Sequence, residues 1–443
     1  MTGLLSRLER NEPERGRTPR EEHWFTQAEV SQRLQELLLG EYSQLVEASR
    51  IDPARKGQLR GVVSTLLVRE ELAVKNKTRE ELAEELTNEI VGYGPLETLL
   101  ADESITEIMV NGPTHIYVER LGQMEETKLS FRDRAHLEGT IQKMIAPLGR
   151  RLDQNSPFVD ARLPDGSRIN AIIPPLALDG PVLTIRRFTM KTLETEEMVR
   201  SGTFSQEMAD FLAFAVRIRL NVLVSGGTGT GKTTLLNFLS HFIPAGRERI
   251  ITIEDSAELQ LRQSHVVRLE TRASSLEGKG EVTIRSLLRN ALRMRPDRII
   301  IGEVRGPEAL DLLWAMNSGH EGSLSTIHAN SPQDALYRLE NMVLMAKEEL
   351  PQPVVREQIR SAIDVIVHLA RFRGNRRVML ISLVDKNANS PQIKIRDLFR
   401  YQPQEDASSA GGHRRAADIE PPENLLARAR LAGILPPVWL PGR

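Results

Sequence analysis

Hydrophobic residues recur at helical spacing through the first part of the chain. Leucines and valines repeat every three or four positions over residues 25–48, and a second such segment covers residues 58–73. Thr78 and Glu81 then form a capping-box pattern, and we expect the helix that follows to stop at Gly92. The beginning of the chain is therefore predicted to be all helical.

The distribution of apolar residues separates this helical region from the first 24 residues of the chain. Residues 1–24 are charged and short of apolar side chains, so we expect them to be disordered. Residues 25–91 form a helical N-terminal extension. The pattern is equally compatible with a packed bundle and with an arm that docks a partner.

After residue 92 the apolar positions become those of short strands, and an Asn-Gly and a Leu-Gly turn separate the first of them. A single helix is expected over residues 134–148. The predicted strands cover residues 106–110, 115–118, 158–163, 168–173 and 182–187. Residues 92–187 are therefore predicted to be a small α+β domain. Residues 188–204 are polar and without pattern, and we expect a hinge there.

From residue 205 to 401, helical and strand patterns alternate, which predicts a parallel sheet with helices on both faces. Residues 402–443 are predicted to be a linker and a tail, because residues 406–412 have the composition of a flexible segment. The tail has one apolar helical face over residues 423–435, followed by Trp439. Packing on its own chain, or docking onto an assembly of such chains or onto a partner, would bury that face.

One strand of this domain runs into a glycine-rich loop and then into a helix, in the order NVLVSGGTGTGKTTLLNFL. The spacing G-x-x-x-x-G-K-T is that of a phosphate-binding loop, whose backbone N–H groups point at phosphate oxygens. Lys232 is expected to reach the β- and γ-phosphates, and the Thr233 hydroxyl is expected to ligate Mg²⁺. The predicted nucleotide-binding residues are Gly226, Gly227, Thr228, Gly229, Thr230, Gly231, Lys232, Thr233 and Thr234.

Two later strands, over residues 249–255 and 295–306, are apolar until they reach carboxylates. The carboxyl ends of parallel strands meet at one edge of a sheet, so these side chains are expected to converge on the nucleotide. Hydrolysis of a phosphoanhydride needs a held Mg²⁺ and a carboxylate that orients or deprotonates water. Glu303 and Glu254 are the first candidates for metal positioning and water activation, followed by Asp255 and Glu258.

Two histidines flank a further predicted strand in the segment GHEGSLSTIHAN. His328, at the end of this strand, is placed to hydrogen-bond a γ-phosphate and to report its presence. His320, at the beginning of the segment, is a candidate to pass that signal to the hinge. Their spacing without other ligand types argues against a metal site.

Composition narrows the class of protein. The 443 residues carry a formal net charge of -1 and contain no cysteine, so disulfides, thiol nucleophiles and cysteine zinc sites are excluded. The near-neutral charge and the aromatic content of 4% argue against a nucleic-acid partner. No apolar run has the length of a membrane span, and the N-terminus lacks a signal peptide's apolar core. We therefore expect a cytoplasmic protein.

The motifs together resemble one family. The phosphate loop, IEDSAEL, IIIGEVRG and GHEGSLSTIHAN are similar, in order, to the Walker A, Asp box, Walker B and His box of the type II/type IV secretion ATPase superfamily. IVGYGPLETLL, ITEIMVNGP and ARLPDGSRINAIIPPLALDGPVLTIRRF extend the resemblance through the preceding domain. Within the superfamily, the chain looks most similar to the CpaF-like ATPases of tight-adherence (Flp/Tad) pilus systems.

This resemblance implies an α/β fold, with a RecA-like ATPase domain after a smaller PAS-like α+β domain. It implies a homohexameric ring that binds ATP and Mg²⁺ and lies peripherally at the inner membrane. There the ring would contact platform proteins and, through them, act on pilin subunits. It also implies that arginines of the smaller domain complete the site. The positions that match are Arg162, Arg168, Arg186 and Arg187, and Arg168 and Arg186 come first because strands hold their guanidinium groups rigidly.

Features of other branches of the superfamily that this sequence lacks support the assignment to one branch. A chain without cysteine cannot carry the tetracysteine zinc subdomain usual in related extension ATPases, and residues 356–371 do not reproduce the AIRNLIRE segment of retraction ATPases. Conjugation-type ATPases lack so long an N-terminal helical extension. The alternatives are a protein-exporting secretion ATPase and a nucleotide-gated scaffold with little turnover. The direction of work, extension or retraction, stays open.

Overall fold

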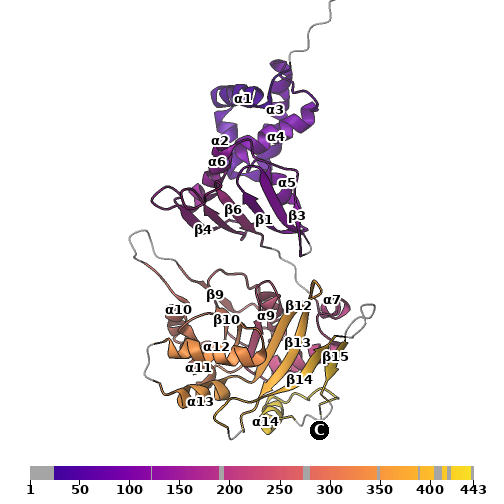
Figure 1. Ribbon diagram of the computed structural model, residues 1–443, viewed down its shortest axis with the longest axis vertical. Helices are drawn as coiled ribbons and strands as arrows, with labels where there is room; N and C mark the ends of the chain where they lie inside the picture. Colours follow the sequence, from indigo (N-terminus) through magenta and orange to yellow (C-terminus); the bar gives the residue numbers. More distant parts are fainter. Residues whose placement is uncertain are drawn as a thin grey trace, which may run out of the picture. The chain divides into compact units, whose positions relative to one another are not determined.

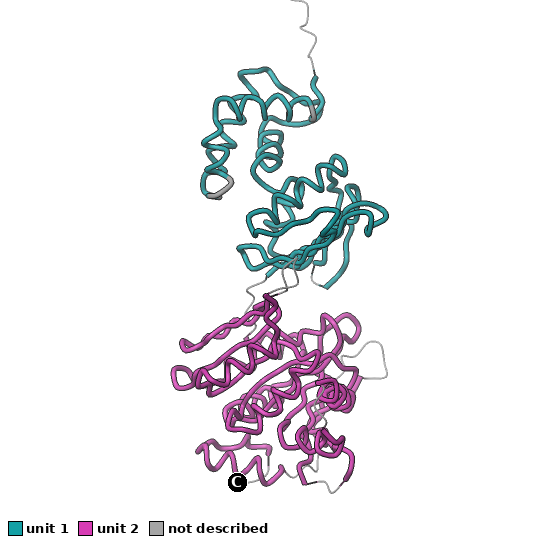
Figure 2. Tube along the Cα trace, turned by 90° about the vertical axis from the view of Figure 1, so that its left-hand side faces the viewer, with its two compact units in different colours: residues 1–189 teal, residues 190–443 magenta. Residues whose placement is uncertain are grey.

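The computed structural model describes residues 24–120, 122–188, 194–272, 280–346, 350–387, 390–403, 412–416 and 421–440. The chain divides into two compact units, residues 1–189 and 190–443 (Figure 2), and each is described by itself. The expected disorder of residues 1–24 falls almost wholly outside the described residues, as does the flexible segment expected over 406–412.

The first unit begins with four packed helices, α1 (Gln27–Glu41), α2 (Ser43–Ile51), α3 (Lys56–Arg69) and α4 (Arg79–Val91) (Figure 1). Val30, Leu34 and Leu59 are fully buried between them, so the bundle alternative describes this region. The predicted capping box is present: the Thr78 hydroxyl accepts from the Glu81 backbone N–H, and the Glu81 carboxylate accepts from Thr78. The first predicted helix is two helices, because the chain breaks at Tyr42.

The rest of the first unit is an antiparallel sheet with helices α5 (Leu96–Ala101) and α6 (Arg134–Ile145). Its six strands lie in the order β3-β2-β1-β6-β5-β4, and alternate residues of β1 and β6 fill a shared core with α6. The strands are β1 (Ile105–Asn111), β2 (His115–Arg120), β3 (Gln123–Glu126), β4 (Phe158–Arg162), β5 (Arg168–Ile172) and β6 (Val182–Arg186). All five predicted strands are present, and β3, which is exposed along its length, is additional.

The second unit is built on a nine-stranded sheet in the order β15-β14-β13-β12-β7-β11-β10-β8-β9. Six neighbouring strands, β12, β7, β11, β10, β8 and β9, pair in parallel, as predicted. On the other side of β12, strands β13, β14 and β15 each pair antiparallel with the strand before them, so one edge of the sheet is antiparallel. The strands are β7 (Val222–Gly226), β8 (Ile250–Glu254), β9 (Val266–Glu270), β10 (Arg298–Val304), β11 (Leu324–His328), β12 (Val365–Phe372), β13 (Asn375–Val384), β14 (Ile395–Gln402) and β15 (Gly412–Arg415).

Helices cover both faces of this sheet, which confirms the α/β class (Figure 1). Residues of β7 alternate between the two cores: Val222 and Val224 face α8, α9 and α14, and Leu223 faces α10 to α13. The helices are α7 (Thr195–Arg200), α8 (Gln206–Arg217), α9 (Lys232–Ser240), α10 (Ile284–Ala291), α11 (Glu308–Asn317), α12 (Pro332–Leu344), α13 (Gln352–Ala362) and α14 (Glu423–Ala432).

The segment expected to be a hinge contains a helix, whereas the helix expected in the tail is present and packs on its own unit. Helix α7 lies within residues 188–204, and both Met198 and Phe204 are buried in the core of the second unit. The tail helix α14 also packs on its own unit through Leu425 and Ala429, and Trp439 lies against Phe399 with ring centroids 5.2 Å apart. Within the described residues, no helix is both long and apolar enough to cross a membrane.

Candidate nucleotide site

The glycine-rich loop occupies the junction between a central strand and its following helix. Strand β7 ends at Gly226 and α9 begins at Lys232, so the loop lies at the carboxyl edge of the sheet with a helix N-terminus pointing at it. Gly226, Gly229 and Gly231 have φ values of 154°, 67° and 95°. A Cβ on Gly226 would lie 2.5 Å from the carbonyl oxygen of Leu369, so only glycine fits against the neighbouring strand.

The side chain of the loop's lysine, Lys232, is positioned by contacts with the loop backbone and with His328. Lys232 Nζ donates to the Gly227 carbonyl oxygen at 2.8 Å and lies 3.3 Å from His328 Nε2. The Thr230 hydroxyl donates to the same carbonyl at 2.9 Å. Thr233 and Thr234 occupy the first turn of α9, where both are half-buried. The predicted phosphate-binding residues thus form one folded loop, and Thr228 and Gly229 are exposed at its tip.

His328 and Glu303 continue the line of contacts from Lys232. The register of the parallel strands puts His328, the last residue of β11, opposite Gly226. Its Nε2 lies 2.8 Å from Glu303 Oε1 on β10, and Arg305 Nη2 donates to Glu303 Oε2 at 2.5 Å. Burial lowers the pKa of His328, and the charge of Glu303 acts in the opposite direction. Lysine, histidine, carboxylate and arginine therefore form a connected row beside the loop.

Glu254 is the other strand-end carboxylate, and it is nearly completely buried. Its Oε2 accepts from the backbone N–H groups of Glu258 and Leu259 at 2.8 and 2.9 Å, while Oε1 is buried without a hydrogen-bond partner. A Cβ on Gly302 of β10 would lie 2.9 Å from Glu254 Cγ, so the side chain is packed tightly against the neighbouring strand. Burial raises the pKa of Glu254 to about 7.

Replacing Glu254 by glutamine is expected to remove a pH dependence of stability. Between the usual carboxyl pKa of 4.5 and the raised value of about 7, the folded chain binds more protons than the unfolded chain. The free energy of unfolding therefore falls as the pH rises through this range, by roughly 3 kcal/mol for this group. Urea unfolding of nucleotide-free protein at both ends of the range measures it. An unchanged pH dependence in Glu254→Gln would contradict this result.

The site offers oxygen ligands that suit Mg²⁺ and leaves most of its coordination to the substrate. Among the described residues, no three His, Cys, Asp or Glu side chains gather as a metal cluster. Mg²⁺ bound to a nucleotide keeps waters and phosphate oxygens and takes only one or two protein ligands. The Thr233 hydroxyl and the unpaired Glu254 Oε1 are oxygen donors of that kind. The residues present therefore fit a nucleotide-bound Mg²⁺.

Three candidate residues from the sequence, Asp255, Glu258 and His320, are not members of the row of contacts beside the loop. Asp255 is half-exposed, with Oδ2 3.9 Å from Arg305 Nη1, and Glu258 contributes its backbone N–H to Glu254. His320 precedes β11 and therefore lies at the opposite edge of the sheet from Gly226, with a buried Nδ1 that has no hydrogen-bond partner. The two histidines are not brought together, so His320 is not part of this site.

The arginines expected from the first unit form a row of their own. In the antiparallel register Arg162 lies opposite Arg168, and Arg168 opposite Arg186, so the three side chains cross β4, β5 and β6 side by side. Arg186 Nε is 3.8 Å from Glu107 Oε1, and the Arg162 guanidinium stacks over the Phe188 ring at 5.6 Å. Arg187 differs, because it donates to the carbonyl oxygens of Asp102 and Ile105.

Several residues that contact the loop or its neighbours were not predicted from the sequence. Arg305 pairs with Glu303, and the buried His368 lies 3.0 Å from the Ser225 hydroxyl on the loop strand. Arg371 and Arg376 both donate to the carbonyl oxygen of Gly229. The segment RFRGNRR could have indicated the last two, because its four arginines surround a Gly-Asn pair, which is typical of a turn.

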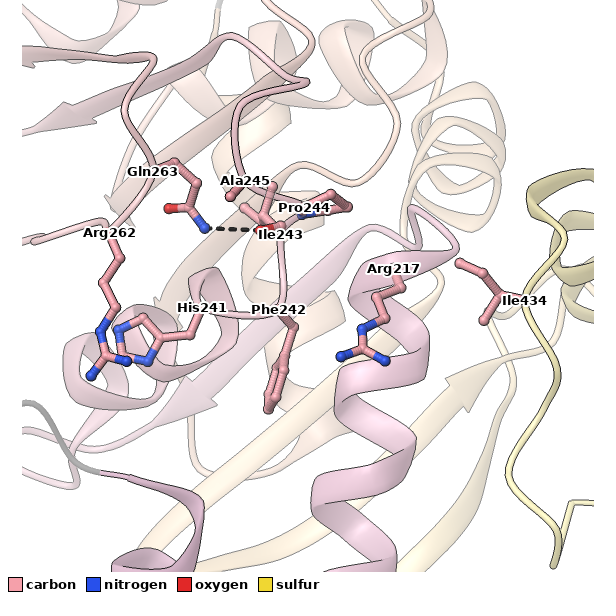
Figure 3. A pocket seen from close by; sticks show the side chains of 9 residues that line it. All are labelled: Arg217, His241, Phe242, Ile243, Pro244, Ala245, Arg262, Gln263 and Ile434. Carbon is pink, nitrogen blue, oxygen red and sulfur yellow. Dashed lines mark hydrogen bonds between the residues drawn. The ribbon is translucent and has the colours of Figure 1, made fainter.

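The second unit also has a cavity of about 380 Å³, which is separate from the loop (Figure 3). It lies around residues 241–245, beyond the C-terminal end of α9, with Ile434 of the tail contributing to its lining. Gln263 donates from its wall to the Ile243 carbonyl oxygen at 3.0 Å (Figure 3). The phosphate loop lies at the other end of α9, a distance of about 13 Å for nine residues. The cavity is not part of the nucleotide site.

Comparison with known proteins identifies the family. Residues 89–416 match the family described as "Type II/IV secretion system protein". A putative conjugal transfer protein of Mycobacterium tuberculosis is 39% identical over 298 residues, which cover 66% of this chain and 84% of the relative. The type IV secretion system protein VirB11 of Brucella suis is 35% identical over 302 residues, covering 62% and 83%.

Solved structures include the VirB11 ATPase of the Brucella suis type IV secretion system in complex with sulphate. It is 30% identical, with a TM-score of 0.36 over 65% of this chain and 92% of that one. The relatives named above belong to conjugal transfer and type IV secretion, and none of them is named for a tight-adherence pilus. The chain belongs to the type II/IV secretion system protein family and is an ATP hydrolase of that family.

Proposed function

We propose that this chain is the ring ATPase of a type IV secretion apparatus and that it powers protein export by hydrolysing ATP. The observation that carries the proposal is the row from Lys232 through His328 to Glu303 beside the phosphate loop. The names of the conjugal transfer and VirB11 relatives support this kind of machine. We further propose that the ring is a homohexamer that lies peripherally at the cytoplasmic face of the inner membrane.

In the proposed reaction each side chain has a separate task. Lys232 neutralises charge on the β- and γ-phosphates, and Glu303 orients the attacking water and accepts its proton. His328, between these two side chains, hydrogen-bonds the γ-phosphate and changes its contacts when that phosphate leaves. Thr233 and Glu254 would hold Mg²⁺, which supplies charge stabilisation to the phosphates when it is bound.

Positive charge from the first unit completes the proposed site. Arg168 and Arg186 lie directly opposite each other on neighbouring strands, and Arg162 lies opposite Arg168 on the next strand. Guanidinium groups stabilise the charge that develops in phosphoryl transfer. We propose that this row closes on the nucleotide only in the assembled ring. Hydrolysis by an isolated chain would then be slow.

Assembly is therefore expected to raise ATPase activity per chain. The measurement is steady-state turnover across a range of protein concentrations, with molar mass determined by light scattering on the same samples. Activity should rise with mass and level off at about six chains. Arg168→Ala should flatten this rise, whereas Arg134→Ala should not, because Arg134 is an exposed arginine of α6 paired only locally with Glu138. A dilute monomer with full activity would contradict the proposal.

A tight-adherence pilus motor is the second candidate. The observation that favours it is the four-helix bundle, most of which lies ahead of the family match that begins at residue 89. Such a motor would contact inner-membrane platform proteins and act on pilin subunits indirectly. Affinity capture from the source cell with the full chain as bait separates the two: platform proteins and pilin favour the pilus motor, and exported proteins favour the secretion ATPase.

A further inference from the structure

The end of helix α14 and the segment after it present large apolar side chains to water. Leu431 is 89% exposed, Leu435 is 75% exposed and Val438 is 82% exposed. Single exposed leucines are ordinary on a protein surface, but these three fall within eight positions. A group of exposed apolar side chains marks a surface that another molecule covers. The family match ends at residue 416, so this surface is not part of the matched domain.

Other side chains of the same segment fix it to the second unit. Leu425 and Ala429 of α14 are buried in the core of that unit, as is Leu440 near the end of the segment. The Trp439 ring lies edge-on against Phe399. The three apolar side chains therefore project from a folded segment, and the fold itself keeps them turned away from the core.

The tail lies at the edge of the sheet away from the phosphate loop. Arg428 Nη1 of α14 donates to the carbonyl oxygen of Arg219 at 3.0 Å and to Asp364 Oδ2 at 3.2 Å. Arg219 precedes β7 and Asp364 precedes β12, so both lie at the amino ends of parallel strands. Gly226 and the loop follow the carboxyl end of β7. A large molecule that covers the tail would therefore leave the nucleotide site open.

The cavity of about 380 Å³ adjoins this apolar surface and contributes a positive charge. Its lining includes Ile434, the residue before Leu435, and Arg217 of α8 (Figure 3). Arg262, on another part of the lining, pairs with Glu194 at 2.5 Å. Arg217 is exposed, and within the described residues its side chain has no ion pair or hydrogen bond. The lining therefore holds one guanidinium that is available to an anion.

Apolar side chains beside an available guanidinium match the chemistry of a phospholipid. The phosphate of the headgroup is an anion for Arg217, and the boundary between headgroups and acyl chains takes up apolar side chains. The composition of the tail agrees, because residues 421–443 contain three arginines and one glutamate. Positively charged segments are attracted to membranes that contain anionic lipids.

We propose that Leu431, Leu435 and Val438 insert into the headgroup region of a membrane, while Arg217 binds a phospholipid phosphate in the neighbouring cavity. This contact holds the second unit at the membrane by the edge of the sheet that does not bind nucleotide. The inference rests on the proposed peripheral location at a membrane and is independent of the exported substrate. It assigns the membrane contact to side chains of the tail and of α8.

The test measures binding of the full chain to vesicles of phosphatidylcholine and phosphatidylglycerol by sedimentation. Leu431→Gln/Leu435→Gln/Val438→Gln should weaken binding at least about tenfold, because three apolar side chains no longer leave water on binding. Its ATPase activity without vesicles should stay at the wild-type level. Leu178→Gln/Met345→Gln is the matched control, since it removes exposed apolar side chains elsewhere, and it should bind vesicles as the wild type does.

The role of the arginine is tested on the same vesicles. Arg217→Gln should weaken binding about fivefold, and Arg217→Lys should restore most of it because the charge is kept. Arg373→Gln is the control, as Arg373 is an exposed arginine beyond the carboxyl end of β12, and its binding should not change.

Three outcomes would overturn the inference. The first is a triple variant that binds vesicles as the wild type does, and the second is a wild type that does not bind them. The third is a triple variant that loses molar mass in light scattering but keeps vesicle binding, which would assign the surface to contacts between copies of the chain. None of these outcomes affects the ATPase measurements, which test the proposed reaction separately.

Discussion

Glu303→Gln should bind ATP and fail to hydrolyse it. The amide has the size of the carboxylate but cannot accept a proton from water, and it removes the charge that lies 2.8 Å from His328 Nε2 and 2.5 Å from Arg305 Nη2. Loss of a general base lowers turnover by on the order of 10²- to 10⁴-fold. Binding is expected to persist, because the glycine-rich loop and Lys232 are unchanged.

The measurement pairs steady-state turnover with equilibrium binding of a labelled ATP. Glu423→Gln serves as the control, since Glu423 is an exposed glutamate of α14 and its variant should keep both properties. Lys232→Ala is the complementary variant, because it should lose binding together with turnover. If Glu303→Gln hydrolyses ATP at a rate within a few-fold of the wild type, Glu303 neither orients the attacking water nor accepts its proton. Glu254 would then be the candidate for water activation.

Arg298→Ala should strongly destabilise the second unit. Arg298 is completely buried at the beginning of β10, where Nη1 donates to the carbonyl oxygens of Val216 and Gly322 at 2.8 and 3.3 Å. Its Nε and Nη2 pair with the Glu248 carboxylate. The guanidinium therefore ties α8, β10 and the turn before β11 together. Truncation leaves Glu248 and two carbonyl groups without this partner, at a cost of about 3–5 kcal/mol.

Chemical denaturation without nucleotide measures this loss. Arg430→Ala is the control, because Arg430 is an exposed arginine of α14 whose removal should change the free energy of unfolding by less than about 1 kcal/mol. Arg298→Met combined with Glu248→Leu removes both charges and should recover most of the stability. A wild-type free energy of unfolding in Arg298→Ala would mean that the buried pair contributes nothing net.

Features encoded within a few residues could be predicted from the sequence. The phosphate loop, the capping box at Thr78 and the strand ending at Glu254 each follow from local spacing, and the structure has all three. The sequence also predicted that Glu303 and His328 lie at the same edge of the sheet, because the carboxyl ends of parallel strands share one edge. These predictions needed no knowledge of which strands are neighbours.

Contacts between distant residues could not be predicted in this way. Arg371 reaches Gly229 because β12 is the neighbour of β7, and the order of strands is set by packing across the whole sheet. The raised pKa of Glu254 depends on Gly302 of another strand allowing close burial. Helix α7 was not predicted, because Met198 and Val199 are the two apolar residues of this six-residue helix and two positions form no periodic pattern. Each of these features depends on tertiary packing.

The most direct test of the central claim is the secretome of the source cell when the chromosomal gene carries Glu303→Gln. We predict that the proteins exported by the proposed secretion apparatus disappear from the medium, although the variant is produced and assembled at the wild-type level. Cells carrying Glu423→Gln should secrete normally. Secretion that continues unchanged in the Glu303→Gln cells would contradict the account, and a loss confined to surface filaments would assign the motor to pilus assembly instead.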